Sequence, residues 1–216
     1  MSEKTKTKTQ FATFEYKGLF GDPVLNNQRL APLLQIMYEG LKQWNIKPEN
    51  VKYRNVTGAM EPSVFYELAN SRMVVGLSHA GITLTVQNAD WSQAELITQL
   101  VAACWNALAT ATPDVKVKEH ELQIAFTVLP EGKSLKEITK PFAAAWNLRP
   151  TDEVDFCGLI LYTAHGLIVL DKNAVNPHAL FIKIVHRFVG HIPMADMAKQ
   201  LFGDEEWVSN VLGLEF

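Results

Sequence analysis

The sequence is poor in cysteine, with only Cys104 and Cys157 among 216 residues. A chain of this length, 48% hydrophobic and 20% charged, buries about 70% of its unfolded surface, so its stability requires no disulfide or metal. Neither cysteine belongs to a Cys-x-x-Cys motif or has a histidine at metal-ligand spacing. We therefore expect both to be reduced and buried in a cytoplasmic protein without a structural metal.

Long apolar runs are also absent. A membrane-spanning helix needs about 20 apolar residues, and the richest stretch, 159–170, is interrupted by polar residues and glycine. The first ten residues, MSEKTKTKTQ, have no apolar region of the kind found in signal peptides. The sequence thus predicts no contact with membranes and a disordered, solvated tail over residues 1–10.

Positive charge is not in excess. The formal net charge is −3, and because the tail holds three lysines against Glu3, the remainder of the chain carries about −5. Lys52-Tyr53-Arg54 has the alternation of cation and aromatic that suits stacking on bases. An acidic body disfavours phosphate binding, so we do not expect nucleic acid as a partner.

The common catalytic and nucleotide-binding motifs are missing as well. The chain contains no Gly-x-Gly-x-x-Gly, P-loop, Gly-x-Ser-x-Gly or His-Glu-x-x-His sequence. No cofactor is therefore expected. An enzyme could still assemble its site from residues that are distant in the sequence.

Hydrophobic periodicity and turn residues divide the chain into two similar series of elements. The first series is a strand at 11–20, a helix at 27–44, four strands at 51–57, 64–70, 73–78 and 82–88, and a helix that ends near Ala109. The second is a strand at 122–128, a helix opened by the capping box Ser134–Glu137, three strands at 154–163, 166–171 and 179–190, and a helical segment at 194–212.

A local echo indicates that the two series arose by duplication. Trp44-Asn45-Ile46-Lys47-Pro48 is followed 102 residues later by Trp146-Asn147-Leu148-Arg149-Pro150. In each copy the asparagine can adopt the left-handed cap conformation before proline stops the helix. We therefore divide the chain into repeats at 11–112 and 113–216 that form one continuous structural unit.

The predicted fold class is α+β: two tandem β-α-β(3-4)-α repeats that form one curved antiparallel sheet with helices on one face. In its element order this arrangement resembles the duplicated saddle of the TATA-box-binding protein, and also the helix-grip fold of plant allergen and lipid-transfer domains. The resemblance covers residues 11–213 and concerns topology.

Two sets of residues are candidates for a site. His186, His165 and Asp155 could form a catalytic or metal-assisted cluster of a small hydrolase-like enzyme, although a core histidine is commoner. Trp44, Trp146 and Tyr162 could instead contact a ligand, although tryptophans at helical spacing usually belong to the core.

The leading functional hypothesis is a non-enzymatic binding protein that recognises a protein partner or a small apolar ligand. Exposed strand edges and an uncovered sheet face also favour self-association, so a homodimer is one expected form. The enzyme built on the histidine and aspartate cluster is the alternative.

Overall fold

A computed structural model describes residues 4–21, 27–55, 62–68, 72–78, 80–89, 94–111, 116–145, 158–190, 196, 203 and 206–215. The chain forms two compact units. Unit 1 comprises Met1–Ala12, Gln123–His186 and Lys199–Phe216, and unit 2 comprises Thr13–Leu122 and Arg187–Ala198. Strands β1, β6 and β9 contribute residues to both units.

The predicted α+β class with a large antiparallel sheet is confirmed. The strands are β1 (Thr5–Phe20), β2 (Val51–Asn55), β3 (Pro62–Leu68), β4 (Met73–Ser78), β5 (Gly81–Gln87), β6 (Val117–Pro130), β7 (Leu159–Tyr162), β8 (Gly166–Lys172), β9 (Leu180–Val189) and β10 (Leu214–Glu215). Their order is β2-β3-β4-β5-β1-β6-β9-β8-β7, and β10 pairs with β1 in parallel. The labelled helices are α1 (Asn27–Leu41), α2 (Ala94–Ala111) and α3 (Leu135–Ala145), with 3₁₀ turns η1 (Lys42–Trp44) and η2 (Pro48–Asn50), and residues 206–212 are also helical.

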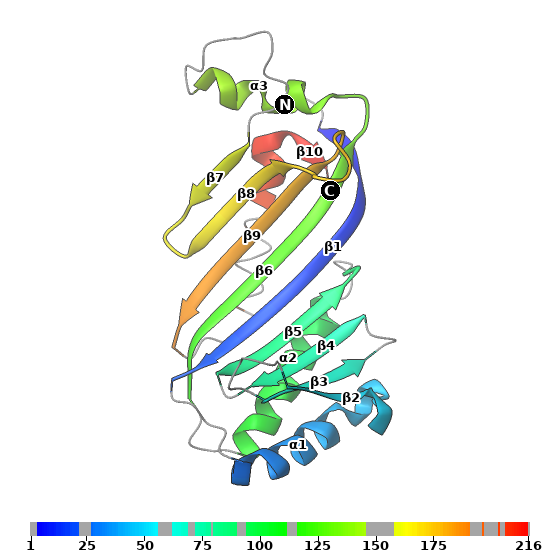
Figure 1. Ribbon diagram of the computed structural model, residues 1–216. Coiled ribbons are helices and arrows are strands. Elements are labelled where there is room, and N and C mark those ends of the chain that lie inside the picture. The colour runs from blue at the N-terminus through cyan, green and yellow to red at the C-terminus, as the bar shows by residue number, and fades with distance from the viewer. Residues whose placement is uncertain are drawn as a thin grey trace. The chain divides into compact units, whose positions relative to one another are not determined.

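Unit 2 buries one face of strands β1 and β3–β5 (Figure 1). A row of opposed side chains crosses these strands, and all of its members are buried: Tyr16, Leu84, Val75 and Tyr66. The Tyr66 hydroxyl donates to the Leu34 carbonyl of α1 over 3.2 Å, which fixes that helix against β3. A Cβ atom on Gly40 would lie 3.4 Å from the Ala107 Cβ, so small residues allow α1 and α2 to approach closely.

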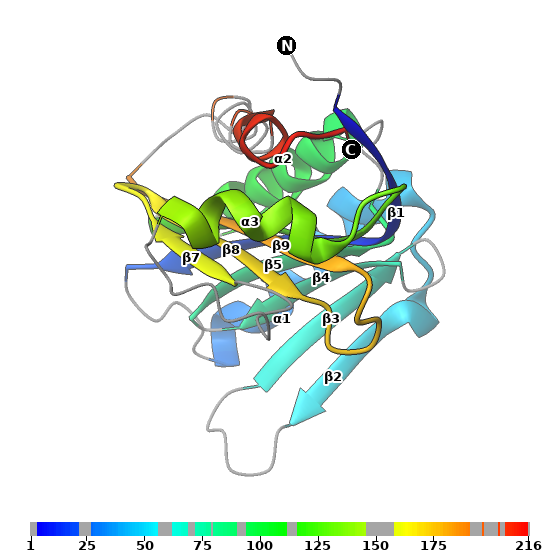
Figure 2. The ribbon, with the colours of Figure 1, turned by 90° about the horizontal axis from the view of Figure 1, so that it is seen from above.

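Unit 1 buries one face of β8 and β9 against the C-terminal helical residues 206–212, which lie behind these strands in Figure 1. Its core includes the buried side chains of Ile168, Leu170, Ile182, Ile184, Val208 and Leu212. Helix α3 lies at one end of β7, β8 and β9 (Figure 2). Its predicted capping box is confirmed, because Ser134 N–H donates to Glu137 Oε2 over 2.8 Å and Glu137 N–H donates to Ser134 Oγ over 3.3 Å.

The N-terminal residues correct one prediction. Residues 5–10, expected to form part of a disordered tail, belong to β1. Thr5 N–H donates to the Gly213 carbonyl over 2.8 Å, and Thr5 itself is buried opposite Leu214. Polar composition misled the prediction because alternate threonines have high strand propensity and because the partner strands are distant in the sequence. Thr5 and Lys6 pair with β10, and β6 is a neighbour of β1 in the sheet.

The end of the first helix agrees with its sequence signal. The predicted helix 27–44 is present as α1 and η1, and Asn45 then adopts the left-handed conformation with φ 57° and ψ 38°. Its N–H donates to the Lys42 carbonyl over 2.9 Å. The matching Asn147 lies outside the described residues.

Replacement of Met37 by alanine should destabilise unit 2, because Met37 is fully buried and the cavity would not refill completely. We expect the free energy of unfolding to fall by about 2–5 kcal/mol, measured by urea denaturation. Gln99→Ala, on the exposed side of α2, is the matched control and should change it by less than about 0.5 kcal/mol. Equal effects of the two substitutions would contradict this description of the core.

Candidate functional site

The histidines of the predicted catalytic cluster differ in environment. His186 lies on the buried face of β9, directly opposite Gly166 of β8. His165 lies in the exposed turn before Gly166, where its backbone N–H donates to Thr163 Oγ1 over 3.3 Å. Asp155 lies outside the described residues, so the three-residue cluster stays a prediction.

The aromatic candidates also differ. Trp44 ends η1 in unit 2 and is half-buried. Tyr162 ends β7 in unit 1 and is 82% exposed. Trp146 lies outside the described residues. Of the two described residues, Tyr162 therefore lies outside the core, because an aromatic side chain in the core would be covered.

Within the described part of the chain, no three histidine, cysteine, aspartate or glutamate side chains gather in a way that could hold a metal ion. The described helices also include none that is both long enough and apolar enough to cross a membrane. The side chains that gather in a distinctive way are instead apolar, and they lie on the sheet of unit 1.

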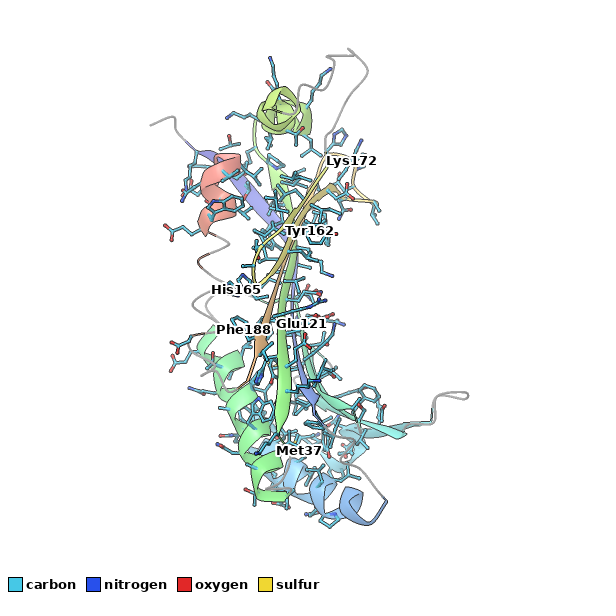
Figure 3. All side chains as sticks on the ribbon, turned by 90° about the vertical axis from the view of Figure 1, so that its left-hand side faces the viewer. Met37, Glu121, Tyr162, His165, Lys172 and Phe188 are labelled. Carbon is cyan, nitrogen blue, oxygen red and sulfur yellow. The ribbon has the colours of Figure 1, made fainter. Side chains whose placement is uncertain are left out.

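We call this surface the open face, defined by the side chains of Ile160, Tyr162, Leu167, Val169, Asp171, Phe181, Lys183 and Val185. The strand register places them together, because Ile160 is opposite Val169 and Tyr162 is opposite Leu167. The 206–212 helix lies on the other side of these strands, and among the described residues no helix covers the open face (Figure 3).

Exposure on the open face increases toward the edge of the sheet. Val185 of β9 is buried, Val169 of β8 is half-buried, and on β7 Ile160 is 55% exposed and Tyr162 is 82% exposed. Each strand contributes apolar side chains to this face, whereas a solvated sheet face normally alternates to polar residues. A contiguous apolar patch of this kind commonly marks an interaction site.

The face of unit 2 that no described helix covers has a different character, since three of its cations, Lys17, Lys52 and Arg187, are paired with carboxylates. Glu121 accepts from Lys17 Nζ over 3.1 Å and from Arg187 Nε over 3.0 Å. Lys52 Nζ lies 2.6 Å from Glu67 Oε2 on the neighbouring strand. These cations are already neutralised by carboxylates, so they do not form a basic surface.

The pKa of the Glu121 carboxyl reflects this pairing. Partial burial raises the pKa, but the hydrogen bonds and charges of Lys17 and Arg187 lower it by more, and the net result is a pKa below the usual range. The carboxylate is therefore ionised in the folded protein at neutral pH, and it acts as the bridge between β1 and β9.

Sequence reasoning did not find a buried polar network in unit 2. The Tyr16 hydroxyl and His120 Nδ1 are 3.0 Å apart, and His120 Nε2 is 3.0 Å from the Gly190 carbonyl. Because that carbonyl can only accept, we assign the proton to Nε2, so that Nδ1 of the neutral ring accepts from Tyr16. Trp105 packs edge-on against Tyr16, and burial raises the tyrosine pKa well above its usual range. These groups fit a structural role, since they satisfy one another inside the core.

Ile160 was also missed as a site residue, although the sequence held a signal for it. In Leu159-Ile-Leu-Tyr162, residues two apart share a face of the strand, so Ile160 accompanies the candidate Tyr162. The run looked like an ordinary core strand because all its residues are apolar. In the structure, however, no described helix covers the face of β7 that carries Ile160, so this side chain is 55% exposed.

The sequence matches no family model and no curated protein. The chemistry of the open face is therefore the basis for assigning a function.

The pairing of Glu121 should make stability depend on pH. Its folded-state pKa is lowered, so its contribution is present above the unfolded pKa of about 4.3 and is lost as pH falls through the folded value. At pH 7, Glu121→Gln should lower the free energy of unfolding by about 1 kcal/mol, and the difference from wild type should shrink below about pH 4. Urea denaturation across this pH range measures both effects. The exposed Glu131→Gln is the control, and an identical pH profile for both variants would contradict the pairing.

The Cys104 thiol should resist alkylation in the folded protein. It is buried, as expected from the sequence, and burial raises its pKa to about 12, which leaves almost no reactive thiolate at pH 8. Iodoacetamide labelling followed by peptide mass spectrometry should find Cys104 unmodified in the native protein and modified in urea. Rapid labelling of the native protein would show that the thiol is accessible.

Proposed function

We propose that this protein is a non-enzymatic interaction protein that binds a protein partner through the open face of unit 1. The observation that carries the proposal is the exposure of Ile160 and Tyr162 beside the half-buried apolar side chains of β8 and β9. Burial of such a surface is favourable, at roughly 25 cal/mol for each Å² of apolar area removed from water. Tyrosine is moreover among the residues that dominate binding energy at protein interfaces.

A protein partner fits the open face better than a small apolar ligand. Sites for small molecules are concave and enclose most of the ligand surface. Tyr162 is 82% exposed at the edge of a sheet, so it stands out from the surface and can insert into a partner. Lys183 adds a half-buried charge on β9 among the apolar side chains, which can orient a partner that presents a carboxylate.

Nucleic acid fits the face of unit 2 that carries Lys17, Lys52 and Arg187 poorly. Binding to phosphates requires cations that can exchange their counterions for the phosphate backbone. Lys17 and Arg187 are held by Glu121, and Lys52 is held by Glu67. Protein recognition is favoured because the open face offers mainly apolar contacts.

We also propose that the chain consists of two related repeats, as in the saddle arrangement that the element order resembles. Two observations support this. In the first repeat, the strands that lie successively farther from β1 are β5, β4, β3 and β2. In the second repeat, the strands that lie successively farther from β6 are β9, β8 and β7. In both repeats, therefore, the last strand of the sequence lies beside the first, and the earlier strands lie farther out. The Trp-Asn echo occupies the same place after the first helix of each series.

The alternative enzyme built on His186, His165 and Asp155 remains a prediction from the sequence. Its aspartate lies outside the described residues, and no observation in the described part of the chain favours it over the binding function.

A photo-crosslinking amino acid placed at Tyr162 tests the proposed function. In extracts of cells that contain the protein natively, we expect a discrete crosslinked product that an excess of unmodified protein abolishes, because the partner covers this side chain. The same amino acid at exposed Thr83, on the uncovered face of unit 2, should give no such product. Tyr162→Ser should weaken binding of the purified partner by about tenfold or more, measured by titration calorimetry.

Equal products from both positions, or a product that excess unmodified protein does not reduce, would count against the open face as the binding surface. A folded Tyr162→Ser variant that binds as tightly as wild type would exclude Tyr162 from the interface.

A further inference from the structure

The two edge strands of the sheet differ in how they are protected. The strand order ends with β2 on one side and β7 on the other, and among the described residues no strand lies beyond either. The sequence of β2 is VKYRN, with charged residues at alternate positions, which is a common protection against pairing with another chain. The sequence of β7 is LILY, with neither charge nor proline. Among the described residues, the β7 edge is therefore open to pairing with a further strand.

The register shows which backbone groups of β7 point outward. Thr163 N–H donates to the Gly166 carbonyl over 2.9 Å, immediately beyond the opposed pair Tyr162 and Leu167. Hydrogen-bonded and non-hydrogen-bonded pairs alternate along an antiparallel ladder. Leu161 therefore directs its N–H and C=O toward β8, whereas Ile160 and Tyr162 direct theirs toward the free edge.

We propose that β7 pairs antiparallel with β7 of a second copy of this chain, with Ile160 of each copy opposite Tyr162 of the other. This inference rests on the proposed binding function and names its partner. A two-fold axis then passes between the Leu161 residues of the two copies, as closed dimers require. In this register every outward N–H and C=O group of Ile160 and Tyr162 meets its complement. A shift by one residue would place outward groups against the inward-directed groups of Leu161.

The side chains of β7 favour a second copy as the occupant. In the proposed register an isoleucine and a tyrosine face each other twice, and aromatic and β-branched cross-strand pairs are stabilising. No like charges oppose each other. The equivalent pairing of β2 with itself would set Lys52 against Arg54 of the other copy, so charge permits self-pairing at β7 and opposes it at β2.

The same pairing partly covers the most exposed part of the open face. Residues directly opposite each other in a sheet lie on the same side, so Tyr162 of one copy packs beside Ile160 of the other. Ile160 and Tyr162, the most exposed apolar side chains of the open face, are therefore the ones that meet between the two copies.

Substitution by proline separates backbone pairing from side-chain contact. Ile160→Pro removes an outward N–H, leaves the ladder between β7 and β8 intact, and is tolerated at an edge. In analytical ultracentrifugation of the full chain over a concentration series, we expect wild type to dimerise and Ile160→Pro to raise the dissociation constant about ten- to a hundredfold, since the symmetric dimer loses a hydrogen bond at each copy. Ile160→Thr keeps the N–H and is the matched control, with an expected change below about tenfold.

Disulfide trapping tests the register. In a Cys157→Ser background, Leu161→Cys should form a disulfide-linked dimer under mild oxidation, because the two Leu161 residues form a closely spaced non-hydrogen-bonded pair. Ile160→Cys should not, because it faces Tyr162. Circular dichroism of every variant confirms that it is folded.

The outcomes separate this inference from the proposed function. A wild-type protein that stays monomeric, a proline variant that dimerises as tightly as wild type, or stronger trapping at residue 160 than at 161 would overturn the β7 dimer. If the photo-crosslinker at Tyr162 nevertheless captures a different protein, with competition by unmodified protein, the binding function stands and only self-pairing is wrong. Monomeric behaviour without any crosslinked product contradicts both.

Discussion

The two-residue period of β7 links the direction of its backbone groups to the direction of its side chains. In any antiparallel edge strand, alternate residues turn their N–H and C=O groups outward, and the same alternation sends their side chains to one face. In β7, Ile160 and Tyr162 have both properties: their backbone groups point toward the free edge, and their side chains lie on the open face. The strand therefore concentrates exposed apolar surface and outward-directed backbone N–H and C=O groups in the same two residues, while Leu159 and Leu161 hold it to β8.

The contrast between the two sheet faces indicates that apolar exposure on unit 1 is not a general property of the sheet. On unit 2, Glu121 and Glu67 neutralise the neighbouring cations, and the uncovered strands carry residues such as Thr83 and Thr85 that water solvates well. One face is thus compatible with permanent exposure. The other leaves a tyrosine and an isoleucine at an edge, which costs solvation free energy unless another molecule covers them.

Local signals in the sequence predicted most elements correctly, because caps and periodicity act over a few residues. Examples are the Ser134–Glu137 capping box and the left-handed Asn45. What failed depended on distant partners: the Lys-Thr segment has the composition of a disordered tail, but it forms a strand with β6 and β10 as neighbours. The contact of Tyr16 with His120 joins residues 104 positions apart, and a single sequence contains no signal for it.

Tyr162 could be chosen from the sequence as a contact residue, but its environment could not. An apolar strand has the same sequence pattern whether it lies at the centre or at the edge of a sheet. The strand order, which places β7 last, supplies the missing information.

The pairing of β1 with β10 has a further consequence, for the order of folding. Lys4 Nζ donates to Ser209 Oγ over 3.0 Å across a separation of 205 residues, so this part of unit 1 closes a loop almost as long as the chain. Loop closure of this kind is entropically costly and slow. During synthesis, residues 13–122 of unit 2 emerge as one continuous segment, whereas unit 1 must wait for residue 214 before its first strand has its final neighbour.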